Sequence, residues 1–172
     1  MKKLLALLLA LTMLLTFAAC GDKDKKDGKK GGEEEPAEPV VQEVTIGDYH
    51  VVYNGAYEYG SNEFGSHFIV LIDFTNNADQ AYKPNTRVYI EVKQDDKLDR
   101  GIEWQGDKIP NSDLYGKDYE EVAPGESISY YNGFSYNPDG GVITVTIMDN
   151  FHQIEDKLVI EIDPATLTPY EK

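Results

Sequence analysis

The chain has 172 residues, of which 31 are acidic and 16 are Lys or Arg, so its formal net charge is −15 at pH 7. A protein of that sign is repelled by nucleic acid, which excludes nucleic-acid partners from its expected functions. Its one cysteine excludes a disulfide within the chain and a zinc site built from several thiolates. Any folded domain must therefore be stabilised by its apolar core.

The first twenty residues combine a basic start, an apolar run and small residues before the cysteine. Lys2 and Lys3 precede a largely apolar stretch from Leu4 to Phe17, and Ala18-Ala19 lead to Cys20. This pattern resembles a bacterial lipoprotein signal. The resemblance implies cleavage before Cys20, a diacylglycerol on its sulfur and attachment to the membrane through acyl chains such as palmitate. Two acyl chains suffice for stable anchoring, whereas one gives only marginal binding.

Two other interpretations of this segment stay open, and each fits less well. Simple secretion would place the bulky Phe17 third from the cut, where signal peptidase prefers a small residue. A retained membrane-spanning helix needs roughly 20 apolar residues, and Leu4 to Cys20 only reaches the lower limit. We prefer the lipoprotein interpretation, which predicts a location at the cell membrane, lipid-anchored on its extracytoplasmic face.

A spacer follows the cysteine, and a folded domain follows the spacer. Residues 21–39 contain Lys, Asp, Gly, Glu and Pro with no large apolar side chain, so they bury too little surface to fold. As a flexible coil they would span about 25 Å on average. The expected organisation is a signal peptide at 1–19, the lipidated cysteine with a disordered linker at 20–39, and one domain at 40–172.

The domain reads as short extended segments separated by turn residues. Asn54-Gly55 and the run from Asn137 to Gly141 are strong turn signals, while Gly47-Asp48 suggests a bend or bulge within a strand. Asp163-Pro164 is expected to end the last strand. The expected strands occupy 44–46 with 49–53, 57–59, 67–75, 87–93, 127–134, 142–148 and 158–162, with a further short one possible at 102–104.

These segments predict an all-β fold. No helical periodicity of useful length follows the signal, and seven or so turn-separated strands favour an antiparallel immunoglobulin-like sandwich. The 67–75 segment is apolar on both faces, which is typical of a central strand. Strand alternation in a sandwich predicts that one of Tyr130 and Tyr131 is buried and the other is not.

Four segments carry a resemblance to a known group of proteins. They are 68–79, with its Thr-Asn-Asn-Ala-Asp end, the strand and acidic turn at 88–98, the Glu-Val-Ala-Pro-Gly-Glu-Ser turn at 121–127, and the late strand at 142–147. Together they resemble small lipoprotein domains of Gram-positive bacteria, in families of unknown function with an immunoglobulin-like, telokin-type sandwich. The resemblance covers about 44–162 and implies that fold. Those families have no established catalytic residues, so it implies none here.

The sequence offers few groups suited to catalysis or metal binding. The histidines, His50, His67 and His152, are not at ligand spacing and are expected at the surface or rim. We expect no cofactor and no metal. The nearest approach to a metal site is a set of loop acids that calcium could use, although Lys97 interrupts the ligand positions; the set comprises Asp95, Asp96, Asp99 and Glu103.

Aromatic residues in the irregular segment 101–119 are the candidate binding residues. Trp104, Tyr115 and Tyr119 lie there among polar and acidic neighbours, and such side chains suit binding surfaces and sugar platforms. Tyrosine is also a common strand residue, so each tyrosine taken singly has a structural explanation as well. An exposed sheet edge that adds a partner's strand is a second contact region.

These observations predict a non-enzymatic, lipid-anchored binding module of the cell surface. Its partner would be an unidentified protein or an envelope glycan. The alternatives are a carbohydrate-binding module that uses Trp104 with neighbouring tyrosines, and, further off, a hydrolase that uses the loop carboxylates. Acids available to the latter continue beyond Glu103 as Asp113, Asp118, Glu120 and Glu121.

Overall fold

The computed structural model describes residues 42–62, 65–99, 101 and 113–171. The chain divides into two units, Met1–Glu38 and Pro39–Lys172, and all the described residues belong to the second. None of the helices that these residues form is long and apolar enough to span a membrane. The signal, the linker, Trp104 and Glu103 lie outside the described residues, and so does the short strand expected at 102–104.

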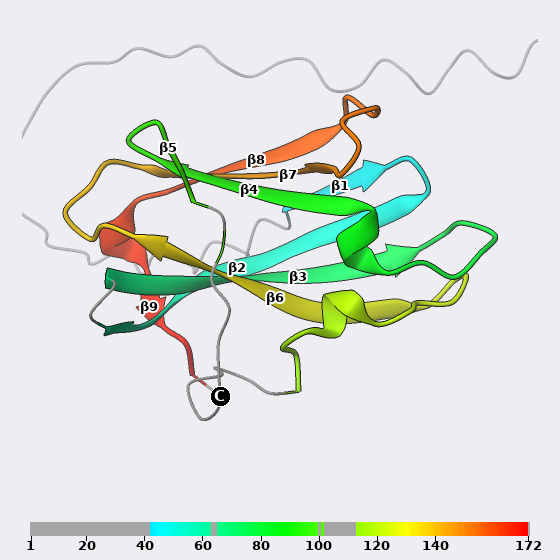
Figure 1. Cartoon of the computed structure of the whole chain (residues 1–172), viewed down its shortest axis with the longest axis horizontal. Helices are drawn as coiled ribbons and strands as arrows, with labels where there is room; N and C mark the ends of the chain where they lie inside the picture. The colour runs from blue at the N-terminus through cyan, green and yellow to red at the C-terminus, as the bar shows by residue number, and fades with distance from the viewer. Residues whose placement is uncertain (1–41, 63–64, 100, 102–112, 172) are drawn as a thin grey trace, which may run out of the picture. The chain divides into compact units, whose positions relative to one another are not determined.

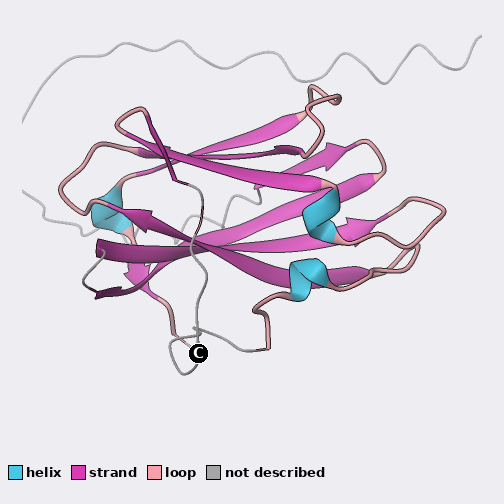
Figure 2. Ribbon diagram, in the orientation of Figure 1, coloured by secondary structure: helices cyan, strands magenta, loops and turns pink. Residues whose placement is uncertain are grey.

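The described residues fold almost entirely as strands joined by short turns (Figure 2). Three single-turn 3₁₀ helices accompany them: η1 (Pro84–Thr86), η3 (Lys117–Tyr119) and η4 (Pro164–Thr166). The strands are β1 (Gln42–Ile46), β2 (Tyr49–Asn62), β3 (Gly65–Asn76), β4 (Val88–Gln94), β5 (Lys97–Asp99), β6 (Ser127–Tyr136), β7 (Ile143–Asp149), β8 (Lys157–Ile162) and β9 (Thr168–Pro169). The predicted all-β class is confirmed.

The strands form two sheets that pack as a sandwich (Figure 1). One sheet has the order β1-β2-β3-β6, with β9 added in parallel to β2, and the other has the order β5-β4-β7-β8. All other pairings are antiparallel. The runs β2-β3-β6 and β5-β4-β7-β8 correspond to strands A-B-E and C′-C-F-G of an immunoglobulin-like sandwich. The prediction of that architecture is therefore confirmed.

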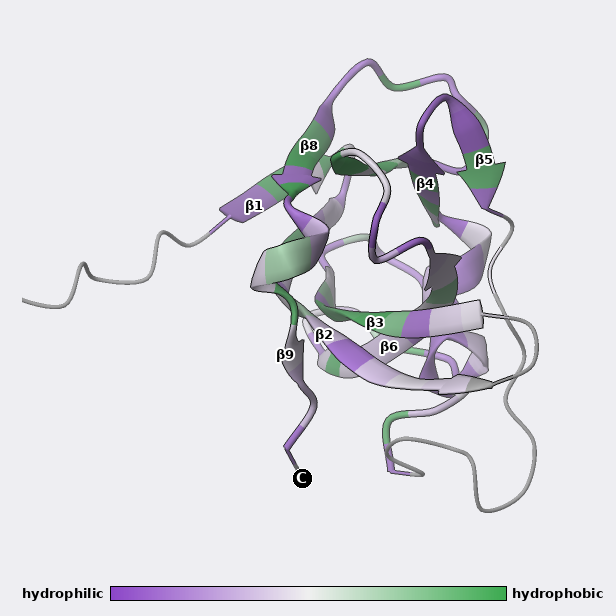
Figure 3. Ribbon diagram, turned by 90° about the vertical axis from the view of Figure 1, so that its left-hand side faces the viewer, coloured by the Kyte–Doolittle hydropathy of each residue, from purple (hydrophilic) through white to green (hydrophobic). Residues whose placement is uncertain are grey.

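The core lies between the sheets and follows the two-residue alternation of the strands. Along β7, Ile143, Val145 and Ile147 are fully buried, while the residues between them are half-buried. In Figure 3, β3 and β8, which belong to different sheets, both carry hydrophobic residues. Apolar side chains from both sheets thus meet in one cluster, which supplies the stability that no disulfide provides.

The central position of β3 is confirmed. It pairs with β2 on one side and β6 on the other. Phe68, Val70, Ile72 and Phe74 face the core with no exposed surface, and Ile69 on the opposite face is equally buried. A strand covered on both faces needs apolar residues at successive positions, which explains its sequence.

Two turn predictions in the first hairpin are wrong. Gly47-Asp48 is the two-residue turn between β1 and β2, since Ile46 pairs with Tyr49. The stronger signal, Asn54-Gly55, forms no hairpin turn: it is a bulge inside β2, where the pairing with β3 shifts between Tyr53 and Gly55. The φ angle of Gly55 is +119°, which a side-chain-bearing residue adopts only under strain.

The prediction that only one of Tyr130 and Tyr131 is buried is also wrong. Their exposed fractions are 2% and 1%. Tyr130 faces the core, as alternation requires. Tyr131 faces the outer side of the sheet, where the Tyr115 ring packs against it at 5.9 Å between ring centroids. The chain that leads into β6 therefore covers part of the outer face, which the sequence pattern alone does not reveal.

Candidate binding site

The edge of β6 that does not pair with β3 is the least regular part of the sandwich. A strand D would lie there in a complete immunoglobulin-like sheet. Among the described residues, this edge instead contacts Tyr115, which forms an isolated parallel bridge with Tyr131, and the short helix η3. Gly101 also approaches it, since a Cβ on Gly101 would lie 3.4 Å from the carbonyl oxygen of Gly133. Among the described residues, this edge is thus bordered by loop segments and a short helix, and not by another strand.

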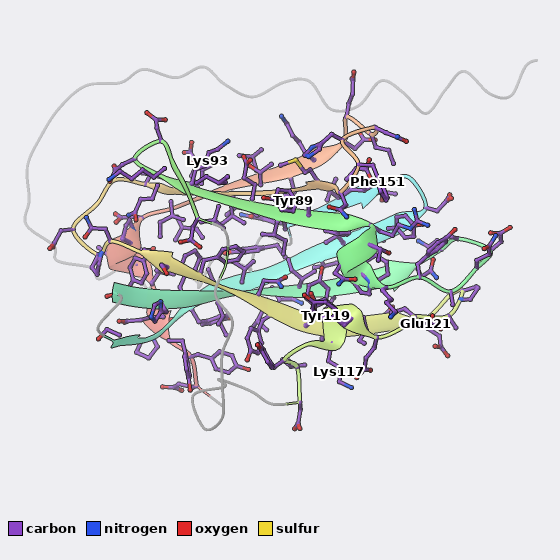
Figure 4. The ribbon with its side chains drawn as sticks, viewed as in Figure 1. Tyr89, Lys93, Lys117, Tyr119, Glu121 and Phe151 are labelled. Carbon is purple, nitrogen blue, oxygen red and sulfur yellow. The ribbon has the colours of Figure 1, made fainter. Side chains whose placement is uncertain are left out.

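A cavity of about 500 Å³ opens between β4 and β6 at this edge. Its walls come from both sheets and from η1 and η3, which brings together residues far apart in the chain. Figure 4 shows two of them, Tyr89 on β4 and Tyr119 at η3, while Lys117 points away from β4. The lining side chains with polar or aromatic character are Asn85, Tyr89, Asp118, Tyr119, Tyr130, Asn132 and Phe134.

Asp118 is the ionisable acid of this cavity. Its exposed fraction is 6%, although it belongs to a short helix at the molecular surface. Burial raises the pKa of its carboxyl group above the usual value, and a hydrogen bond from the Asn132 side chain opposes that rise. No Lys, Arg or His is among the described residues that line the cavity. Among these described residues the carboxylate therefore has a hydrogen-bond donor but no cation.

Asn132 occupies an inward-facing position in a strand whose other inward residues are apolar. It pairs in register with Val70 and lies between Tyr130 and Phe134 on the same face. Burial, followed by the nearby charge of Asp118, raises the pKa of the Tyr130 hydroxyl. Asn85, from η1, also lines the cavity, and its Oδ1 atom is closed off from solvent with no hydrogen-bond partner among the described residues. The acceptor that a ligand with donors would meet in the cavity is therefore mainly the Asp118 carboxylate.

A second cavity, of about 350 Å³, lies on the other side of η3 against the outer face of β6. Tyr115, Tyr119 and Tyr131 line it together with Asp118 and Asn132. The Tyr119 side chain is 64% exposed and lines both cavities. Two of the predicted binding residues, Tyr115 and Tyr119, thus lie together at one site, while the third, Trp104, is outside the described residues.

The predicted calcium candidates take part in turns. Asp95 and Asp96 form the β4–β5 turn, where both have positive φ angles, and Asp95 accepts a hydrogen bond from the Gly141 backbone at 3.1 Å. Asp99 accepts one from the Gly101 backbone at 2.8 Å. Within the described part of the chain, no group of three or more His, Cys, Asp or Glu side chains is arranged to hold a metal ion.

The three histidines do not share a site. His50 lies near Glu43, with 3.5 Å between Nε2 and the carboxylate, and His152 is exposed in the β7–β8 turn. The expectation of a surface or rim position is wrong for His67, which is 3% exposed on the outer face of β3. Burial lowers the pKa of its imidazole, and the charge of Asp99 opposes this.

The sequence predicts the aromatic residues of this site but not the polar pair between them. It presents Asp118 only as one acid among several and gives no motif that includes Asn132. The available signal was the alternation of β6: Ile128, Tyr130 and Phe134 are inward and largely apolar, so an amide at Asn132 is out of pattern. An out-of-pattern polar residue in a core strand indicates a partner, and that partner is Asp118.

A solved structure of a "putative lipoprotein" from Staphylococcus aureus subsp. aureus NCTC 8325 is similar to this chain, with a TM-score of 0.57. The alignment covers 76% of this chain and 99% of that chain, at 14% sequence identity. The two proteins share a fold. At this identity the likeness extends no further than the fold, so membership of a particular domain family stays a prediction. No protein-family model and no curated protein matches the sequence.

Proposed function

We propose that this chain is a lipid-anchored, non-enzymatic binding module on the extracytoplasmic face of the cell membrane. The signal-like start with Cys20 supports the anchor, and the fold shared with the staphylococcal protein is consistent with it. The proposed contact surface, here named the η3 edge, comprises Tyr115, Asp118, Tyr119 and the cavities that they line on either side of β6.

The observation that carries this proposal is the exposure of Tyr119 beside a buried carboxylate. Most of the Tyr119 surface, 64%, is left exposed by folding, whereas a partner that covers it would bury a large amphipathic surface. Asp118 next to it adds a polar group that water reaches poorly. Aromatic anchors beside enclosed polar groups are the usual composition of the centre of a binding surface.

The test compares the capture of envelope components by wild-type protein and by single variants. We expect Tyr119→Ala to lower recovery of a specific partner at least tenfold, and Trp104→Ala to lower it as well if its loop belongs to the same surface. Phe151→Ala is the matched control, because Phe151 is an aromatic residue of similar exposure, 55%, in the β7–β8 turn and lines neither cavity. Equal recovery by Tyr119→Ala and wild type would contradict the proposed surface.

A carbohydrate-binding module is the second candidate function. It is favoured by the same combination, because sugars stack on aromatic rings and hydrogen-bond to carboxylate and amide groups such as those of Asp118 and Asn132. Tryptophan fluorescence titrated against a panel of envelope glycans tests it, with Tyr119→Ala as the variant that should abolish any shift. The hydrolase alternative needs paired carboxylates, and Asp118 is the only acid that lines the larger cavity among the described residues.

A further inference from the structure

We propose that the cavity between β4 and β6 binds a primary ammonium group, with Asp118 as its counter-ion. The ammonium would belong to a free alkylamine or to a lysine side chain of the partner. This inference rests on the binding role proposed for the η3 edge and adds the chemistry of the group that is bound.

The charge balance of the cavity is the first argument. The exposed fraction of Asp118 is only 6%, yet the described residues that line the cavity include no cation. The nearest basic residue along η3 is Lys117, whose ammonium pairs with Glu120 at 2.8 Å and points away from β4 (Figure 4). A buried carboxylate without a counter-ion is an unfavourable arrangement that a bound cation would relieve.

The hydrogen-bonding groups are the second argument. Asp118 accepts from Asn132 and retains further acceptor capacity on its carboxylate. Tyr89 and Tyr119, which line the same cavity, carry hydroxyl oxygens that can accept as well. The lining therefore favours a ligand group that donates several hydrogen bonds. An ammonium has three donors and no acceptor, which matches that preference.

The aromatic walls are the third argument. Tyr89, Tyr119, Tyr130 and Phe134 line the cavity around the polar atoms. Aromatic rings attract cations through their faces and pack against the methylene chain that carries an alkylammonium. Exposure of the Tyr119 ring leaves one wall open to solvent, so a chain ending in an ammonium can enter there without the sheets moving apart.

Binding should be linked to the ionisation of Asp118. The other titratable groups that line the cavity are the hydroxyls of Tyr89, Tyr119 and Tyr130, and the Lys117–Glu120 pair lies outside it. The ammonium of the ligand stays charged throughout the pH range in which a carboxyl group titrates. Because the raised pKa of Asp118 keeps part of it protonated at acidic pH, amine affinity should increase as pH rises through that pKa and then become constant.

The experiment titrates the full-length protein in detergent with three probes by isothermal calorimetry. They are cadaverine, a Gly-Lys-Gly peptide with blocked termini, and the same peptide acetylated on the lysine nitrogen. We expect saturable binding of cadaverine, of the lysine peptide, or of both, and none of the acetylated peptide. Binding of one amine alone identifies whether the natural source is a free amine or a lysine side chain.

Two variants separate a specific site from general attraction to an acidic protein. Asp118→Asn keeps the shape and the acceptor toward Asn132 and should weaken amine binding at least tenfold. Glu121→Gln removes the same charge from an exposed residue that does not line the cavity and should leave binding unchanged. The rise of wild-type affinity with pH provides a measurement that needs no variant.

Equal binding of amines by Asp118→Asn and wild type, binding of the acetylated peptide, or no amine binding at all would overturn the proposal. These results are distinct from failure of the binding role itself. If Tyr119→Ala still loses the envelope partner while amines bind to neither protein, the η3 edge remains the binding surface and the ammonium inference alone is wrong.

Discussion

At the scale of single residues, the most consequential pair is Asp118 and Asn132. Neither belongs to a motif, and their significance comes from position. Asn132 places an amide on a strand face that is otherwise apolar. The helix η3 brings the Asp118 carboxylate within hydrogen-bond reach of that amide. Buried polar groups in a core of this size are expected to have a role, because each carries a desolvation cost.

A stability measurement tests the state of Asp118. Its pKa in the folded protein is raised, so the native state holds the proton more tightly than the unfolded chain does, and ionisation above that pKa destabilises the fold. We therefore expect Asp118→Asn to be more stable than wild type at neutral pH, on the order of 1 kcal/mol. The difference should shrink as pH falls through the native pKa of Asp118.

Urea unfolding at pH 7.5 and at pH 4 would measure this difference. Glu121→Gln is the control, since removing an exposed charge should change the free energy of unfolding by less than about 0.5 kcal/mol at either pH. Lower stability of Asp118→Asn at neutral pH would mean that the carboxylate is stabilised by a partner, which contradicts the uncompensated charge inferred here.

At the scale of elements, strands could be predicted where alternation or continuous apolarity is strong. The segments that became β3, β4, β6, β7 and β8 were placed within a few residues for that reason. The sequence misled at Asn54-Gly55, because the same dipeptide that favours a hairpin turn also supplies the positive φ of a bulge. Local sequence does not distinguish these two uses. Register against β3 decides between them.

Gly55 provides the test of the bulge. A Cβ at this position would approach the Tyr57 ring at 3.0 Å, and φ is +119°. We expect Gly55→Ala to lower the free energy of unfolding by about 1–3 kcal/mol, as measured in urea. Asn54→Ala, one residue away and exposed, should change it by less than about 0.5 kcal/mol. Similar small effects of the two substitutions would indicate that the backbone at Gly55 is not strained.

At the scale of the whole molecule, the proposed organisation is a lipid anchor at Cys20, a spacer and a β-sandwich domain whose sequence contains no cysteine. The sequence could predict the sandwich class because turn-separated strands without helices have few other solutions. It could predict only part of the site, because the η3 edge combines β4, β6, η1 and η3, whose proximity depends on the packing of two sheets. Composition predicts Tyr115 and Tyr119 as binding residues, whereas Asp118 and Asn132 are recognised only when the register of the strands is known.

The anchor is tested by replacing the cysteine. Cys20→Ser removes the sulfur to which a diacylglycerol would attach, so we expect lipidation and processing to stop and the unprocessed chain to accumulate. Phe17→Leu is the control, because a lipoprotein signal accepts a large apolar residue there and membrane attachment should persist. Continued processing and membrane association of Cys20→Ser would point to one of the other two interpretations of the segment.

The central claim, that the η3 edge is where this protein meets its partner, is tested most directly by photo-crosslinking in intact cells. A benzoylphenylalanine placed at Tyr119 should form a discrete crosslinked product, because the exposed ring lies at the centre of the proposed surface. The same group at Phe151, equally aromatic and exposed but in the β7–β8 turn, should form none. Crosslinks at Phe151 with none at Tyr119 would contradict the account.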